Sequence, residues 1–182
     1  FLGNIHPALQ GKVLDQIERP KLVGADTMNL WIDITRDTLL ELIARLDLLI
    51  INENEARMLS GEKSIFEAMD QLHKFGPKTL VIKRGAYGAI LSHEDGHFFT
   101  PAYPLRELKD PTGAGDSFAA GFMGHLARED STDFETMKRA LFTGTVMASL
   151  ACEGFSFDET IGAEPEEIEA RVQELLRLTQ LS

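Results

Sequence analysis

Cysteine is nearly absent from the sequence: Cys152 is the single one among 182 residues. A lone cysteine excludes an internal disulfide bond and any zinc site built from cysteine alone. The histidines are scattered and show no metal-ligand spacing. A chain of this length can bury a core without cross-links, and the composition suits a reducing compartment, which predicts a cytoplasmic protein.

Basic residues are also scarce. Lys and Arg number 18 against 29 Asp and Glu, which gives a formal net charge of −11 at pH 7. A surface this acidic argues against nonspecific binding of nucleic acid or of an anionic membrane, because both rely on basic patches. A small anionic ligand is not excluded, since a local site can oppose the charge of the whole protein.

Long apolar runs are missing too. The stretch 47–51 is a buried strand at most and is too short to span a membrane. Residues 1–7 contain no initiator Met, no basic segment and no apolar signal core. They have the pattern of the end of a strand, so we expect the chain to be a fragment.

Strand and helix patterns alternate along the chain. Buried strands are predicted at 21–25, 48–51 and 78–83, and a hairpin turn at Asp95-Gly96 joins 89–91 to 97–100. Helices are predicted from Pro7 to a stop at Pro20 and at 38–46, 53–60, 64–75, 117–128, 134–151 and 165–178. Such alternation predicts an α/β fold with a mainly parallel sheet covered on both faces, in three α/β/α layers.

Local features are predicted as well. The first helix has an apolar face formed by Leu9, Val13, Leu14 and Ile17. Gly61 closes one helix, and Ser64 begins the next with Glu67 in the capping-box position. The stretch 158–167 is predicted to be a polar loop. Since no repeat or linker interrupts the chain, residues 1–182 are predicted to form a single domain.

The glycine-rich segment 109–118 carries residues suited to phosphoryl transfer. Gly113, Ala114 and Gly115 precede a helix, where free N–H groups and the helix dipole form an anion site. The carboxylate of Asp116 can accept a proton from a substrate hydroxyl while these N–H groups hold the developing negative charge. In the alternative interpretation, Asp116 and Ser117 only cap a helix and the glycines only serve a tight turn. The segment is neither a P-loop nor a dinucleotide-binding fingerprint.

The string Asp110-Pro-Thr-Gly-Ala-Gly-Asp-Ser-Phe118 resembles the C-terminal signature D-x-x-G-A-G-D of the ribokinase-like (PfkB) carbohydrate kinases. The resemblance runs along essentially the whole chain and covers only the C-terminal portion of the family. It implies a ribokinase-like fold in which residues 1–182 form a single C-terminal portion of the kinase domain, with the N-terminal strands and the lid missing. It further implies that Asp116 is the catalytic base and that the anion hole is formed by Gly113, Ala114 and Gly115.

A second motif, Asn52-x-x-Glu55, follows the strand 48–51. In the family, such an N-x-x-E motif supports Mg²⁺ and its waters, and Mg²⁺ prefers oxygen ligands. The resemblance therefore assigns Mg²⁺, held through water, to Asn52 and Glu55. In the alternative interpretation, Asn52 is only a helix N-cap with Glu55 as the third helical residue.

Two further sets of residues are assigned by the resemblance alone. The segment 81–88 is similar to the family's K-x-G-x-x-G region beside the nucleotide phosphates, which implies nucleotide binding by Lys83, Gly85 and Gly88, with Arg84 as added charge. In several members a monovalent cation lies behind the anion hole, and here its ligands would be Asp110, Thr112, Ser149, Cys152 and Gly154. Oxygen ligands and loop carbonyls suit K⁺.

The resemblance implies an ATP-dependent kinase that phosphorylates a hydroxyl of a sugar or nucleoside, with ATP and Mg²⁺, and with K⁺ at the cation site. Two alternatives stay open: a kinase of the same superfamily that acts on a vitamin-type alcohol, and a non-catalytic nucleotide-binding relic. The expected partners are a small-molecule substrate and a second copy of the chain in a homodimer, with no nucleic acid and no membrane. Because the lid is missing, the fragment alone is expected to turn over poorly.

Overall fold

The computed structural model describes residues 1–180, and the chain divides into two compact units. Unit 1 comprises Phe1–Arg84 and Ile90–His97, and unit 2 comprises Gly85–Ala89 and Phe98–Ser182. Within residues 1–180, none of the helices combines the length and the apolar character needed to cross a membrane.

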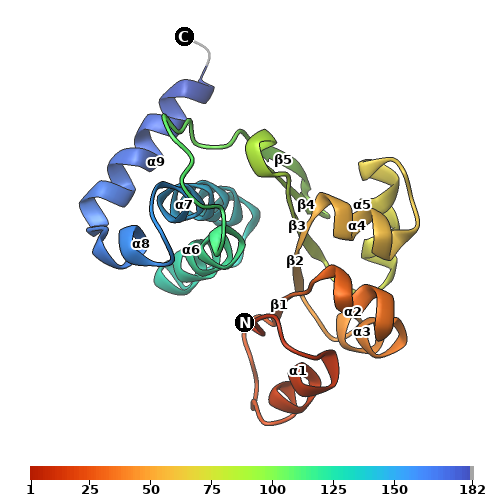
Figure 1. Cartoon of the computed structure of the whole chain (residues 1–182). Helices are drawn as coiled ribbons and strands as arrows, with labels where there is room; N and C mark the ends of the chain where they lie inside the picture. The colour runs from red at the N-terminus through yellow and green to blue at the C-terminus, as the bar shows by residue number, and fades with distance from the viewer. Residues whose placement is uncertain (181–182) are drawn as a thin grey trace. The chain divides into compact units, whose positions relative to one another are not determined.

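A five-stranded sheet has the strand order β1-β2-β3-β4-β5 (Figure 1). Its strands are β1 (Gly24–Asp26), β2 (Leu48–Asn52), β3 (Thr79–Lys83), β4 (Ala89–His93) and β5 (Gly96–Thr100). β2 pairs in parallel with β1 and with β3. β4 and β5 are joined by two residues only, so they form a hairpin as predicted, because parallel neighbours need a long crossover. The turn residues are Glu94 and Asp95, one position before the predicted Asp95-Gly96. The sheet is therefore mixed, with β1, β2 and β3 parallel and a hairpin at β4 and β5.

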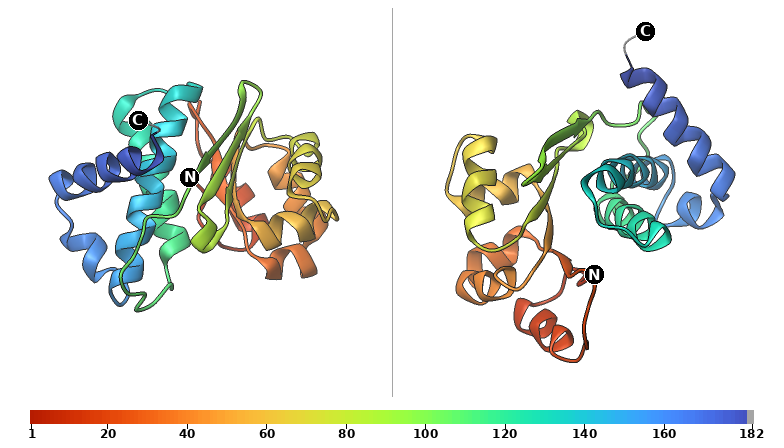
Figure 2. Two further views of the ribbon diagram at one scale, coloured as in Figure 1. Left: turned by 90° about the horizontal axis from the view of Figure 1, so that it is seen from above. Right: turned by 180° about the vertical axis from the view of Figure 1, so that it is seen from behind.

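Four helices of unit 1 lie on one side of the strands in both Figure 1 and Figure 2: α2 (Asn29–Ile34), α3 (Arg36–Ile43), α4 (Glu53–Ser60) and α5 (Ile65–Lys74). Alternate strand residues such as Leu49, Ile51 and Ile82 pack with Leu59 and Met69 of these helices in one buried core. The intervening residues of the strands are also buried. Burial of successive strand residues is the pattern of a parallel α/β sheet, as the apolar runs predicted.

The first helix differs from its prediction. α1 (Pro7–Leu14) begins at Pro7 as expected but ends well before Pro20. Its predicted apolar face is wrong, since Leu9 and Val13 are exposed and the polar Gln10 is buried. The cause is a set of hydrogen bonds: the Gln10 side-chain amide donates to the backbone carbonyls of Leu2 (3.1 Å), Gly3 (3.0 Å) and Asp26 (3.2 Å).

Unit 2 contains η1 (Gly85–Tyr87), α6 (Ala114–Glu129), α7 (Phe134–Glu153), α8 (Asp158–Gly162) and α9 (Pro165–Thr179). α6 and α7 lie side by side (Figures 1 and 2) and are joined by a short turn, so they run antiparallel. Val172 and Leu175 of α9 pack on Phe142, Val146 and Leu150 of α7.

Glycines let α6 and α7 approach each other closely. A side-chain carbon at Gly121 would lie 2.6 Å from the Met147 side chain and 3.0 Å from the Thr143 carbonyl oxygen. A side-chain carbon at Gly144 would lie 2.8 Å from the carbonyl oxygen of Phe118. Contacts of 2.6 and 2.8 Å are shorter than side-chain carbons make, so the two glycines set the spacing of the helix pair.

Two local predictions are corrected by the structure. Ser64 is the N-cap of α5, but its side chain accepts no capping hydrogen bond, so the predicted capping box with Glu67 is wrong. Both side chains are exposed, and water can satisfy the free N–H groups there. The stretch 158–167 is not only loop, since it contains the short helix α8, whose first turn carries Asp158 and Glu159. Acidic side chains stabilise the first turn of a helix.

A matched pair of substitutions tests the helix spacing. We expect Gly144→Ala to destabilise the protein by about 1–3 kcal/mol, because the added methyl group meets backbone. Gly124→Ala on α6 meets nothing within 4 Å, and we expect it to stabilise the protein by about 0.5–1 kcal/mol through helix propensity. Urea unfolding followed by circular dichroism measures both. Similar effects from both substitutions would contradict the spacing argument.

Candidate active site

Gly113 forms the turn through which the signature loop enters α6. Its backbone has φ of 82°, in the left-handed region where glycine carries no strain. Gly113 is the N-cap of the helix, so Ala114, Gly115 and Asp116 form the first helical turn. The alternative in which Asp116 acts as the helix cap therefore does not describe this helix.

Two backbone donors remain open in this turn. The N–H group of Ala114 donates inside the loop at 3.1 Å, and that of Ser117 donates to the Gly113 carbonyl at 2.9 Å. The N–H groups of Gly115 and Asp116 find no acceptor among residues 1–180. They lie at the positive end of the helix dipole, and the carboxylate of Asp116 is exposed in the same turn. The turn can thus offer both anion-binding donors and a proton acceptor.

The start of the signature loop contacts the end of α7. The N–H group of Lys109 donates to the carbonyl of Cys152 at 2.9 Å. Asp110 Oδ1 accepts the Thr112 N–H group at 2.9 Å, and hydrogen bonds from Thr112 lower the pKa of Asp110. Burial, followed by the charges of Asp110 and Glu153, raises the pKa of the Cys152 thiol. Of the predicted cation ligands, Asp110 and Cys152 are thus close together.

The other predicted cation ligands have contacts of other kinds. The hydroxyl of Ser149 is buried and donates to the Val146 carbonyl at 2.6 Å. Gly154 is buried beside Glu159, whose side chain would lie 2.5 Å from an added carbon. Thr112 is exposed and serves the turn at Asp110 through its N–H group.

In unit 1, Asn52 and Glu55 form a complete capping box at the start of α4. Asn52 Oδ1 accepts the Glu55 N–H group at 2.9 Å, and Glu55 Oε2 accepts the Asn52 N–H group at 3.0 Å. Glu55 is only 8% exposed. Burial raises its pKa, and the N–H group of Asn52 and the charge of Lys83 oppose that rise. The helix cap of the alternative interpretation is therefore present in the structure. The amide oxygen of Asn52 and the carboxylate of Glu55 are also the kind of ligand that Mg²⁺ prefers.

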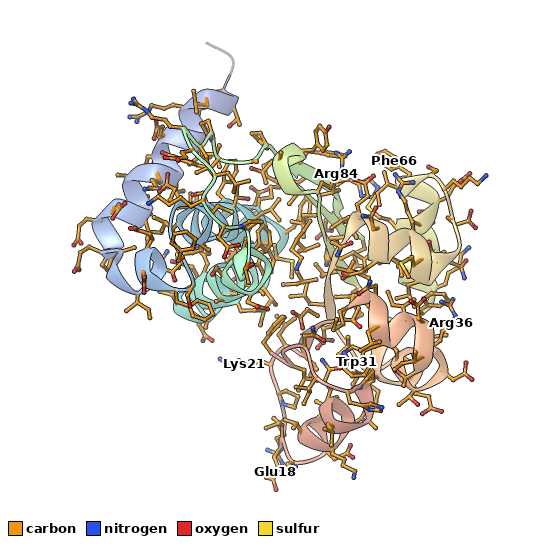
Figure 3. The ribbon with its side chains drawn as sticks, viewed as in Figure 1. Glu18, Lys21, Trp31, Arg36, Phe66 and Arg84 are labelled. Atoms are coloured by element: carbon orange, nitrogen blue, oxygen red, sulfur yellow. The ribbon has the colours of Figure 1, made fainter. Side chains whose placement is uncertain are left out.

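The motif also holds a charged residue, Glu53, to which the sequence assigned no role. Glu53 accepts hydrogen bonds from Arg84 Nε at 2.7 Å and from Arg57 at 2.5 Å. The Arg84 bond, followed by the Arg57 bond, lowers the pKa of Glu53. The side chain of Arg84, labelled in Figure 3, thus already has a carboxylate partner. The charge of Lys83 acts on a different carboxyl group, that of Glu55, and opposes the rise in its pKa. The spacing of Glu53 and Arg57 was the available signal, since residues four apart meet on a helix.

The glycines of the predicted nucleotide turn have different roles. Gly88 has φ of 86°, and an added carbon would lie 1.9 Å from the Thr100 carbonyl oxygen. Gly85 has φ of 56° and open space around it. Gly88 is therefore required because the backbone at Thr100 approaches it too closely for a side chain. Gly85 is required for its positive φ angle, which the turn needs. Across residues 1–180, no three His, Cys, Asp or Glu side chains gather as a metal site.

Comparison with known proteins defines the class of the chain. Residues 21–160 match the pfkB family carbohydrate kinases, and the chain belongs to this family. A cytidine kinase from Thermococcus kodakarensis is 41% identical over 96 residues, which cover 51% of this chain and 34% of that protein. The chain thus matches well under two thirds of the length of this relative.

Solved structures agree with this membership. The crystal structure of aminoimidazole riboside kinase from Salmonella enterica, complexed with aminoimidazole riboside and an ATP analogue, has a TM-score of 0.71 at 25% identity, over 83% of this chain and 52% of that chain. A candidate ribokinase II from E. coli, in complex with ATP and Mg²⁺, has a TM-score of 0.70 at 27% identity, over 84% and 49% of the two chains. The family and the ribokinase-like α/β/α fold class predicted from the sequence are therefore confirmed.

The buried carboxyl of Glu55 predicts a pH dependence of stability. Because its pKa is raised from 4.5 in the folded state, folding favours the protonated form. The stabilisation from Glu55 is therefore fully present below about pH 4.5 and is lost as the pH rises through the folded pKa. We expect the free energy of unfolding, compared with that of Glu55→Gln, to rise as the pH falls from 7 to 4.5. Urea unfolding of both proteins at several pH values measures the difference, and a difference that grows with pH would contradict the assignment.

Proposed function

We propose that the protein is an ATP-dependent kinase that transfers a phosphoryl group to a hydroxyl of a sugar or nucleoside. The observation that carries the proposal is the first turn of α6, where the open N–H groups of Gly115 and Asp116 lie beside an exposed carboxylate. We further propose that both units belong to one kinase domain, of which residues 1–182 are the C-terminal portion. We also propose that the protein acts in the cytoplasm, where its lone thiol stays reduced.

In this proposal the first turn of α6 performs two tasks. The carboxylate of Asp116 takes the proton of the acceptor hydroxyl, which makes the oxygen a better nucleophile. In the anion hole proposed at Gly113, Ala114 and Gly115, the N–H group of Ala114 already donates within the loop. The open N–H groups of Gly115 and Asp116 would therefore hold the negative charge that builds up on the transferred phosphoryl group. Backbone donors suit this task because a helix terminus fixes them before the reaction begins. Phosphoryl transfer needs little more than such positioning and charge stabilisation.

Mg²⁺ and the nucleotide are assigned to unit 1 and to the following turn. Asn52 and Glu55 would hold the hydrated metal, which neutralises phosphate charge when bound. The nucleotide would contact Lys83, Gly85 and Gly88. A monovalent cation would be held by the carboxylate and carbonyl oxygens around Asp110, Thr112, Ser149, Cys152 and Gly154.

The relatives support these assignments by what they are called and by what they bind. The names cytidine kinase and aminoimidazole riboside kinase describe phosphorylation of nucleoside-like substrates. The ATP analogue and the ATP with Mg²⁺ in the two structures favour a nucleotide and a divalent metal for this chain. The matched chains are about twice as long as the part covered here, so the acceptor is proposed only as a class.

Removal of the proposed base is the direct test. In the full-length enzyme we expect Asp116→Asn to lower kcat by at least about 10²-fold with little change in ATP affinity, because the amide keeps the shape and loses the basicity. Glu129→Gln, at the other end of the same helix, also removes an exposed carboxylate and should leave kcat unchanged. A screen of sugars and nucleosides with ATP and Mg²⁺ provides the assay. Full turnover by Asp116→Asn would refute the mechanism.

The metal assignment has its own test. We expect Glu55→Gln to raise the Mg²⁺ concentration that gives half-maximal activity, because the side chain that holds the hydrated ion loses its charge. Asn54→Ala changes an exposed residue of the same turn outside the motif and should have a much smaller effect. Activity is measured across a Mg²⁺ titration for each variant. Equal shifts for both would show that α4 has only a structural role.

A further inference from the structure

The loop that leads to the signature is anchored on the last helix. Residues 101–113 form neither helix nor strand. Near the start of this loop, the Tyr103 hydroxyl donates to Glu174 Oε2 of α9 at 2.5 Å. The guanidinium of Arg171, one turn earlier on α9, lies 5.4 Å from the centre of the Tyr103 ring. The first part of the loop is therefore fixed by α9.

Arg171 also reaches the end of α7. Its Nη2 atom lies 2.8 Å from Glu153 Oε2 and 3.1 Å from Glu167 Oε1, and its side chain is only 18% exposed. Glu153 is 32% exposed and Glu167 is 48% exposed, so the pair with Glu153 is the less screened by water of the two. Glu153 is the last residue of α7, and the carbonyl before it, that of Cys152, accepts the Lys109 N–H group.

Both anchors of the loop thus meet at one side chain. At the start of the loop, the ring of Tyr103 contacts the guanidinium of Arg171. At the end of the loop, the Lys109 N–H group binds the carbonyl of Cys152, and the next residue, Glu153, pairs with Arg171. These residues line a cavity of about 460 Å³. An irregular segment of this length loses much conformational entropy on ordering, so a few fixed contacts decide its path.

We infer that Arg171 is a positioning residue for the signature loop. By holding Tyr103 and Glu153, it fixes residues 103–109 and hence the point at which Asp110 begins the turn into α6. The inference rests on the proposed kinase function for its catalytic consequence, but the loop anchoring is independent of it. A small displacement of this turn would misplace the open N–H groups and Asp116, and misplacement of about 1 Å costs on the order of 10²-fold in rate.

Hydrogen exchange of backbone amides tests the anchoring. In Arg171→Gln we expect exchange at the Lys109 amide to quicken by at least about tenfold, while amides in the middle of α6 and α7 keep their protection. The control is Arg177→Gln, an exposed residue of the last turn of the same helix that loses the same charge. Equal exchange at Lys109 in the two variants, or a uniform loss of protection throughout unit 2, would overturn the inference.

Two further variants separate positioning from simple destabilisation. The double variant Arg171→Glu, Glu153→Arg restores the ion pair with the charges exchanged, and we expect it to recover part of the Lys109 protection lost in Arg171→Glu alone. In a kinase assay with the full-length enzyme we expect Arg171→Gln to lower kcat by about tenfold with KM for ATP changed by less than about twofold. If the unaltered full-length enzyme shows no kinase activity, the proposed function fails while hydrogen exchange still decides the anchoring. Loss of kcat without faster exchange at Lys109 would overturn it.

Discussion

The close packing of α6 against α7 supports the whole signature region. Gly121 and Gly144 leave no room for a side-chain carbon, so the two helices are fixed in register as well as in distance. Because they run antiparallel, the C-terminal end of α7 lies beside the N-terminal end of α6. The Cys152 carbonyl at that end holds the Lys109 N–H group, and the loop then needs only a short turn at Gly113 to enter α6.

The proposed phosphate site uses neutral donors in a strongly acidic protein. The chain has a net charge of −11, yet the open groups of Gly115 and Asp116 are backbone N–H groups at a helix N-terminus. Charges farther away than about 8 Å are largely screened at physiological ionic strength, so the local donors decide whether an anion binds. In unit 1 the positive charges of Arg84 and Lys83 face Glu53 and Glu55, which keeps the two motif segments together at the ends of β2 and β3.

Sequence patterns predicted well where neighbouring residues determine the structure. The helix 53–60 ends at Gly61 as expected, because Gly61 adopts the left-handed conformation that terminates a helix. The strands 48–51 and 78–83 follow from short apolar runs, which are typical of strands buried on both faces. The apolar periodicity gave a wrong buried face for α1. Gln10 is buried there because its amide donates to the carbonyls of Leu2 and Asp26, and the spacing of apolar residues contains no sign of these contacts.

The sequence by itself determined the family, the alternation of strands and helices, and the glycine-rich turn with its carboxylate, because all of these depend on residues a few positions apart. Tertiary structure decided which side chains form hydrogen bonds and ion pairs with each other. Arg84 meets Glu53 across 31 residues and Tyr103 meets Glu174 across 71, and the burial that raises the pKa of Glu55 comes from segments folded around it. Such contacts depend on how whole elements pack, and packing is specified by shape and volume summed over many side chains, which no local pattern contains.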